Sequence, residues 1–162
     1  RRERVFFCAV RNDIDVPPLK LAPTHRWISA GEATSDVQVL TDEERGDIGM
    51  TETEHRYWLA TKKGSNFEDA CKKETGKSSW FSRVRMDDSG PCNTLTANHN
   101  DFKHWSDPRR LTYREWVRLG SFPDDYRAKT DKIGKYMIGM SVPPKMTEAV
   151  ARAVCSQWLG LQ

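Results

Sequence analysis

The sequence has little cysteine, no long apolar run and almost no excess of one charge sign. The four cysteines (Cys8, Cys71, Cys92 and Cys155) lie far apart without a Cys-x-x-Cys pair, so we expect no metal site and a reducing compartment. No stretch is apolar enough to cross a membrane. The net charge of +3 does not by itself indicate binding to nucleic acid. An ordinary soluble protein of 162 residues remains, large enough for one domain.

The strongest local signals in the sequence surround Thr112. Thr112 and Glu115 have the spacing of a capping box and predict a short helix after Thr112. Leu111 precedes this cap and is placed to pack on Trp116 as a hydrophobic staple. Gly120 follows the last apolar residue and is expected to end the helix in the left-handed conformation. So many agreeing signals indicate a fixed platform in the fold.

Three runs follow one another around this predicted helix. They read Arg-x-Leu-Thr-x-Arg-Glu from Arg109, Phe-Pro-Asp-Asp-Tyr from Phe122 and Ile-Gly-Met-Ser-Val-Pro-Pro from Ile138. Their order, spacing and residues closely resemble the last two motifs of the DNA (cytosine-5) methyltransferase family. The chain departs from the family pattern at two positions. Gly120 stands where the family usually has Gln, and Met140 stands where it has Asn.

The N-terminal residues resemble the same family. The apolar run from Val5 to Val10 is typical of a strand buried on both faces, as in a mostly parallel α/β sheet. Arg2-Glu3-Arg4-Val5-Phe6 resembles the family's Gln-x-Arg-x-Arg-Val-Phe motif, whose Gln would precede residue 1. The resemblance implies that Arg4 reaches the target cytosine and that Arg2 supports the active site. From the residues alone, a solvated strand entry is the favoured interpretation of these arginines, because charge runs usually lie in solvent.

Residues 17–100 are polar, interrupted by Gly and Pro, and carry the possible capping boxes Thr41-x-x-Glu44 and Ser65-x-x-Glu68. The resemblance implies that this interval is the target recognition domain, a small mixed α+β domain. Basic and aromatic side chains gather in its second half, where a solvated helix face and a phosphate-facing surface both stay open. They are Lys62, Lys63, Lys72, Lys73, Lys77, Trp80, Phe81, Arg83 and Arg85.

The predicted DNA-binding residues are drawn from this interval and the next. Arg83 and Arg85 belong to the basic group, and Thr94-Leu95 resembles a pair that the family places beside the DNA backbone, where it positions without specifying sequence. Arg109 is assigned to the same set, although we also expect it to tie the recognition domain to the following helix.

Three further side chains resemble chemical groups but lack the right context. Pro91-Cys92 matches the family's nucleophilic dipeptide, which should precede the strand of the N-terminal arginines. We therefore predict that Cys92 is a packing cysteine and that the nucleophile lies outside this chain. His99 and His104 are predicted to be surface loop histidines, because no other ligands stand at a recognised spacing.

The end of the chain is assigned to the cofactor and to packing. By resemblance, the residues Gly139, Met140, Ser141 and Val142 line the pocket for S-adenosylmethionine, with glycine letting the backbone come close. After Pro144, apolar residues at helical spacing predict an amphipathic helix that ends at Gly160.

These observations lead to a C-terminal fragment of a Rossmann-like α/β methyltransferase. We expect a catalytic-domain strand in 1–16, the target recognition domain in 17–100, and a closing segment with the C-terminal helix in 101–162. The complete enzyme would methylate carbon 5 of a flipped-out cytosine in double-stranded DNA. This part alone should be inactive without its N-terminal catalytic part.

Two alternatives remain open. One is a DNA-binding specificity subunit of a split methyltransferase, and the other is a non-catalytic DNA-binding relative. We expect a cytoplasmic protein of a bacterium or a phage-infected host. Self-protection from a restriction nuclease, phage modification and regulation are all compatible with the sequence.

Overall fold

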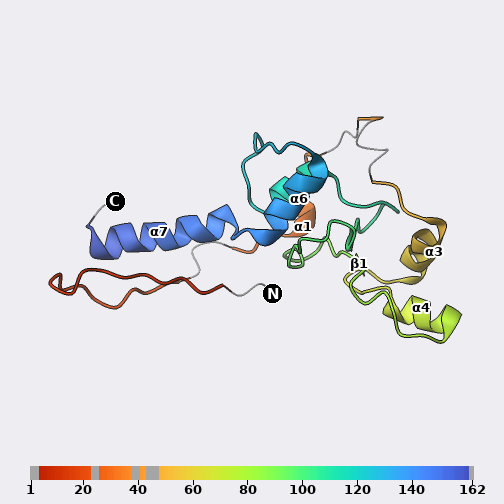
Figure 1. Cartoon of the computed structure of the whole chain (residues 1–162), viewed down its shortest axis with the longest axis horizontal. Coiled ribbons are helices and arrows are strands. Elements are labelled where there is room, and N and C mark those ends of the chain that lie inside the picture. The colour runs from red at the N-terminus through yellow and green to blue at the C-terminus, as the bar shows by residue number, and fades with distance from the viewer. Residues whose placement is uncertain (1–3, 23–25, 38–40, 43–47, 161–162) are drawn as a thin grey trace.

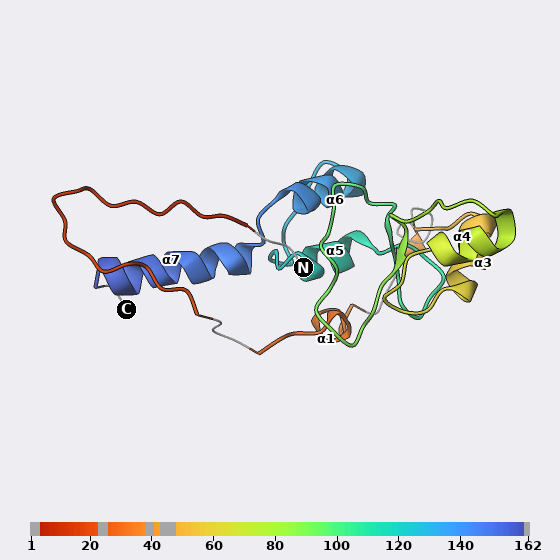
Figure 2. The same cartoon turned by 90° about the horizontal axis from the view of Figure 1, so that it is seen from below.

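The structure, a computed structural model, describes residues 4–22, 26–37, 41–42 and 48–160. The elements named within these ranges are α1 (Ala30–Ala33), α3 (Glu52–Ala60), α4 (Glu68–Thr75), β1 (Val84–Arg85), β2 (Phe102–Lys103), α5 (Tyr113–Leu119), α6 (Asp131–Met140) and α7 (Pro144–Trp158). Helices α1, α5 and α6 form the middle of the molecule, with α3 and α4 at one end (Figures 1 and 2). At the other end, α7 lies beside the N-terminal segment.

The main core is built around α5. Its capping box is confirmed, because the Thr112 side chain accepts from the Glu115 N–H and the Glu115 side chain accepts from the Thr112 N–H. Leu111 and Trp116 are both fully buried in the same cluster, as the predicted staple requires. Phe102 of β2 packs edge-to-face on Trp116 at 5.7 Å between ring centroids. The short helix is therefore a fixed part of the core.

The end of α5 differs from the prediction. Gly120 has φ −76°, a right-handed value, and Ser121 takes the left-handed conformation with φ +60°. Glycine is needed at position 120 for space, because a Cβ there would lie 2.6 Å from Cγ2 of Ile138 in α6. This close packing of α5 on α6 gives a physical reason for Gly120 where the family usually has Gln.

A second apolar cluster holds α3 against α4. Tyr57 and Trp58 of α3 pack with Phe67, which precedes α4, and with Cys71 within it. The helix α3 begins with a complete capping box at Thr51 and Glu54, which our reading of the sequence missed.

The predicted boundaries of this region are partly correct. The box expected at Ser65 is wrong, because Asn66 Oδ1 accepts the Glu68 N–H and Phe67 occupies the cap position. Gly76 ends α4 in the left-handed conformation with φ +71°, as predicted. The box expected at Thr41 includes Glu44, which lies outside the described residues.

The strands β1 and β2 form a two-stranded parallel sheet in which Val84 pairs with Phe102 and Arg85 with Lys103. Because the strands are parallel, the segments that lead into them arrive at the same end of the sheet. The Val84 N–H donates to the Asp101 carbonyl at 2.7 Å at this end. The loops 77–83 and 94–101 are thereby joined where they enter the sheet.

The strand predicted over Val5–Val10 is absent from this structure. The described residues 4–10 are not in a strand, with Val5 79% and Phe7 96% exposed. A strand buried on both faces needs neighbouring strands and covering helices, and the part of the chain described here supplies none for this run. The mixture of helices and strands agrees with α/β, while the Rossmann-like sheet remains a prediction.

The predicted C-terminal amphipathic helix is confirmed as α7. Pro144 occupies its first turn, and Gly160 follows the cap residue with φ +63°. The Trp158 indole Nε1 donates to the Pro17 carbonyl at 2.8 Å, and Gln157 exchanges two hydrogen bonds with the Lys20 backbone. No helix in the described ranges is both long and apolar enough to cross a membrane.

Candidate functional site

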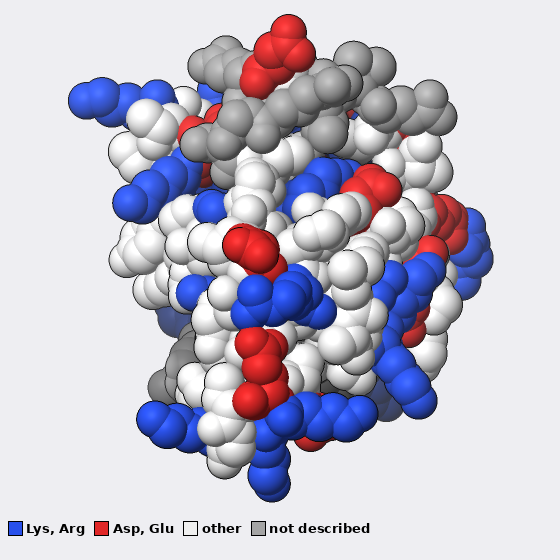
Figure 3. All heavy atoms as spheres, turned by 90° about the vertical axis from the view of Figure 1, so that its right-hand side faces the viewer, with Lys and Arg blue, Asp and Glu red and all other residues white. Residues whose placement is uncertain are grey.

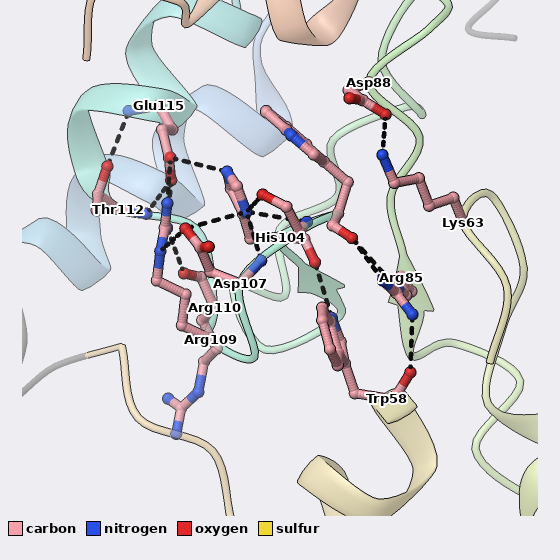
Figure 4. A network of polar contacts seen from close by, with 12 residues as sticks. Trp58, Lys63, Arg85, Asp88, His104, Asp107, Arg109, Arg110, Thr112 and Glu115 are labelled. Atoms are coloured by element: carbon pink, nitrogen blue, oxygen red, sulfur yellow. Dashed lines mark hydrogen bonds and ion pairs between the residues drawn. The ribbon is translucent and has the colours of Figure 1, made fainter. Parts of the chain in front are cut away.

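A buried ion pair joins Arg109 to the start of α5 (Figure 4). The guanidinium donates to both carboxylate oxygens of Glu115, at 2.8 and 2.9 Å. Burial alone would raise the pKa of Glu115, but the hydrogen bonds and charge of Arg109 outweigh it and lower that pKa. Since this guanidinium is committed to a carboxylate inside the fold, the structure supports the predicted tying role of Arg109 and gives no support to DNA contact.

His104 lies in the same network, so the prediction of a surface histidine is wrong at this position. Its Nδ1 accepts hydrogen bonds from the Asp107 and Ser106 N–H groups, at 3.1 and 3.3 Å. Burial lowers the pKa of His104 to about 4, and the charge of Arg109 acts in the same direction. The ring is therefore neutral at pH 7, and it stacks on Trp105 at 4.0 Å. An open hollow of about 570 Å³ borders it.

Arg85 is an internal clamp. Its Nε and Nη2 donate to the Trp105 carbonyl, and its Nη1 donates to the carbonyls of Trp58 and Thr61. The guanidinium also lies 3.7 Å from the centroid of the Trp58 ring. Burial lowers the pKa of Arg85. All three nitrogens bind within the fold, so this geometry supports an internal role for Arg85 and leaves its DNA contact a prediction.

Arg83 lies at the end of the sheet where the loops lead into the strands. Its Nη1 donates to Asp101 at 2.8 Å, and its Nε lies 3.9 Å from the Glu54 carboxylate. Glu54 also pairs at 2.7 Å with Lys103, which is fully buried. About a quarter of the Arg83 side chain is exposed, so it braces the sheet while part of the side chain remains accessible to solvent.

The segment from Thr94 to Thr96 packs directly against α6. Leu95 is buried in the main core, and the Thr94 hydroxyl is buried without a hydrogen-bond partner among the described residues. A Cβ at Gly139 would lie 2.1 Å from the Thr96 carbonyl oxygen. The close approach that Gly139 permits is thus to the chain's own backbone. The predicted DNA segment and the predicted cofactor motif meet at this point.

The rest of the cofactor motif lies at the end of α6. The Met140 and Val142 side chains are 62% and 37% exposed. Ser141 caps the helix, and its hydroxyl donates to the Met137 carbonyl at 2.6 Å. An apolar, open wall with one hydroxyl fits the adenosyl part of S-adenosylmethionine. This fit does not depend on Gly139.

The remaining predicted side chains have varied surroundings. Arg4 is exposed on the N-terminal segment, and Arg2 lies outside the described residues. The Cys92 thiol packs against the core with its Sγ 3.6 Å from the Leu119 carbonyl oxygen. Burial raises the pKa of Cys92, which disfavours the thiolate that a nucleophile needs. The prediction of a packing cysteine agrees with this environment.

The comparisons with known proteins agree on one family. A family model described as C-5 cytosine-specific DNA methylase matches residues 1–156. The Type II methyltransferase M.BbvI of Brevibacillus brevis is 28% identical over 172 residues, covering 95% of this chain and 44% of the relative. M.NgoFVII of Neisseria gonorrhoeae is 29% identical, with 94% and 45% covered. The chain therefore spans less than half the length of these two relatives.

A shorter relative is also similar. The Type II methyltransferase M.AquIB of Picosynechococcus sp. is 34% identical over 88 residues, which are 46% of this chain and 63% of the relative. No solved structure matches the chain. The match to the family model covers nearly the whole sequence, from the N-terminal arginines through the motif that begins at Ile138. The chain belongs to the C-5 cytosine-specific DNA methylase family.

Proposed function

We propose that this chain is the target-recognition and closing part of an enzyme that methylates carbon 5 of cytosine in DNA. The observation that carries the proposal is the contact between Gly139 and Thr96, which fixes the predicted cofactor motif to the predicted DNA segment. One rigid unit would then hold the two substrates in register, and such positioning contributes strongly to catalysis. S-adenosylmethionine, when bound, supplies the methyl group.

The cofactor would rest on one wall formed by this chain. Met140 and Val142 offer exposed apolar side chains, on either side of Ser141, whose hydroxyl donates to the Met137 carbonyl. The other walls would come from the catalytic part, which would also bring the nucleophilic cysteine. Gly139 serves this wall indirectly, by letting α6 pack on the Thr96 backbone.

The DNA would contact the end of the sheet at which the loops 77–83 and 94–101 lead into the strands. Arg83 is partly exposed there, whereas the Thr94 hydroxyl is buried, so Thr94 would position this segment beside the DNA without contacting it. Arg85 and Arg109 would support this surface from within the fold, Arg85 by binding backbone carbonyls and Arg109 by binding Glu115. Arg4 would reach the flipped cytosine, with Arg2 in support. The bacterial relatives favour a cytoplasmic setting for this chemistry.

A split enzyme is the second candidate, and one comparison favours it. The 88 residues matched in M.AquIB are 63% of that relative, so it is only about 140 residues long, shorter than this chain. A methyltransferase polypeptide of this size therefore exists. In such an enzyme, the chain would bind DNA for a separate catalytic chain.

Methyl transfer from labelled S-adenosylmethionine to mixed-sequence duplex DNA tests the proposal. The chain alone should transfer nothing. A fusion that places the part of M.BbvI preceding the matched region before Arg1 should methylate cytosine, as should a mixture of the two parts if the enzyme works as a split pair. Cys92→Ser should leave the rate within about twofold, because this thiol is buried and not the nucleophile.

Two outcomes would contradict the proposal. Methylation by the purified chain alone would show that the catalytic thiol lies within it. A correctly folded fusion that binds both DNA and cofactor but transfers no methyl group would favour a non-catalytic DNA-binding role. The preceding part of M.BbvI, assayed alone, is the control for background transfer.

A further inference from the structure

Phe81 is an aromatic side chain without an internal packing role. It lies in the loop between α4 and β1 and is 71% exposed. The adjacent Trp80 is partly buried and packs against the cluster of α3 and α4. Burying an exposed phenylalanine would gain free energy, so a partner that covers this ring would be favoured by it.

The loop around Phe81 is held rigidly. Trp80 has φ +66°, a conformation that is strained for a bulky residue. Its ring packs edge-to-face on Tyr57 at 5.4 Å, and the Arg83 guanidinium lies 5.9 Å from its centroid. The Arg83 N–H donates to the Trp80 carbonyl at 3.1 Å. These contacts maintain the strained backbone and leave the next side chain, Phe81, in solvent.

The same loop lies beside a second polar loop. Arg83 and Val84 both bind Asp101, through its side chain at 2.8 Å and its carbonyl at 2.7 Å. Asp101 also accepts from Thr96 Oγ1 and from Asn98 Nδ2, at 3.1 and 2.8 Å. Asp101 therefore fixes the two loops to each other.

Basic and acidic side chains both lie near this loop. Lys77 opens the loop and is exposed, and the last turn of α4 carries exposed Lys72 and Lys73. Glu74 forms an ion pair with Arg56, whereas Glu68 accepts from the Ser78 hydroxyl and keeps its charge. Asp69 is a further acidic group on α4, and Lys77 is an exposed basic side chain of the loop itself. Figure 3 shows the end of the molecule that carries α3 and α4, where basic side chains lie among acidic ones.

We infer that Phe81 stacks on a base of the DNA, with Lys77 contacting the adjacent phosphate. The inference rests on the proposed function and adds a residue to it. An aromatic ring that enters a base step gains stacking, and enzymes that unstack a base need such compensation. A rigid loop makes the insertion inexpensive, because little conformational freedom is lost on binding.

Fluorescence anisotropy with the full 162-residue chain tests this inference. The probes are a labelled mixed-sequence duplex and a labelled single strand, each titrated at several salt concentrations. Phe81→Ala should weaken binding by about 5- to 100-fold, the range for loss of one base–aromatic stack. Phe81→Trp should restore most of it. The salt slope should stay unchanged for Phe81→Ala and fall by about one for Lys77→Ala.

Leu59→Ala is the matched control, because Leu59 is 64% exposed on α3 and lies outside the loop. Leu59→Ala should bind DNA as the unaltered chain does. Leu59→Ala and Phe81→Ala should both have the melting temperature of the unaltered chain. If the unaltered chain binds DNA and Phe81→Ala binds equally well, the inference fails while the proposed function stands. Equal losses in both variants would also overturn it. If the unaltered chain binds no DNA, the inference fails, while methylation by the fusion still decides the proposed function.

Discussion

At the scale of single residues, the network around His104 shows how burial selects a protonation state. Two backbone N–H groups point at Nδ1, so that nitrogen must carry a lone pair and not a proton. Nε2 lies 3.6 Å from the Glu115 carboxylate, but the neighbouring Arg109 already neutralises that charge. The Glu115 carboxylate therefore does little to stabilise a protonated imidazole, and His104 stays neutral.

This arrangement predicts a stability that depends on pH. The pKa of His104 is lowered in the folded protein to about 4, while an unfolded histidine titrates near 6.5. Between these values the unfolded chain binds more protons, so acid favours unfolding. The free energy of unfolding should fall by about 2 kcal/mol from pH 7 to pH 5 through this group. Urea unfolding at a series of pH values measures it.

The variant His104→Asn isolates this contribution. Its amide oxygen can still accept the two backbone N–H groups, but the side chain does not titrate, so the dependence between pH 7 and pH 5 should flatten. His55→Asn is the control, because His55 is exposed on α3. Equal pH dependence in all three proteins would show that His104 is not buried neutral.

The same residues show where sequence reasoning stops. The capping box of Thr112 and Glu115 was predictable because both partners lie within one helical turn. Nothing local marks Lys103 as buried or Arg85 as an internal clamp, since Lys103 pairs with Glu54 and Arg85 with carbonyls 20 or more residues away. Such partners appear only when the chain folds, so a sequence pattern alone does not show the internal hydrogen bonds of Arg85.

At the scale of elements, two glycines let α6 pack closely on its neighbours. A Cβ at Gly134 would lie 2.4 Å from the Tyr113 ring of α5, and one at Gly139 would strike the Thr96 carbonyl. Both glycines fall inside a helix, where glycine costs about 0.5–1 kcal/mol relative to alanine. Close packing on two sides offsets this cost.

Gly139→Ala should therefore destabilise the protein despite its better helix propensity. The methyl group has no room beside Thr96, so α6 must move away, at a cost of about 1–3 kcal/mol. Thermal unfolding measures the loss, and a lowered affinity for S-adenosylmethionine in the active fusion would accompany it. Gly90→Ala has no atom within 4 Å of its new Cβ and should be nearly neutral. Unchanged stability in Gly139→Ala would show that the contact is not tight.

The elements differ in how far the sequence predicts them. Helices α5 and α7 were predicted because their caps and apolar stripes are local patterns. The run Val5–Val10 has an equally clear pattern, yet it forms no strand here. A helix satisfies its own backbone, whereas a strand depends on partners outside itself. The apolar pattern of Val5–Val10 therefore predicts a strand only where neighbouring strands are present to pair with it.

At the scale of the whole molecule, the exposed apolar side chains indicate surfaces that another part of an enzyme would cover. Phe7 and Val5 lie on the N-terminal segment, and Tyr136, Met137 and Met140 lie on α6. Contiguous exposed apolar patches on soluble proteins mark interaction sites. In the proposed enzyme, both surfaces would face the catalytic part, with residues 5–10 completing its sheet.

Amide hydrogen exchange distinguishes this arrangement from an independent unit. In the chain alone, the amides of residues 5–10 should exchange rapidly, because no strand pairs with them. In the fusion with the catalytic part they should be protected by at least about a hundredfold, since strand amides deep in a sheet open only with much of the fold. The amides of α5 should be protected in both proteins and serve as the internal control. If residues 5–10 exchange equally fast in an active fusion, they are not a strand of the catalytic sheet, and the family motif that they resemble must reach the cytosine from an exposed loop.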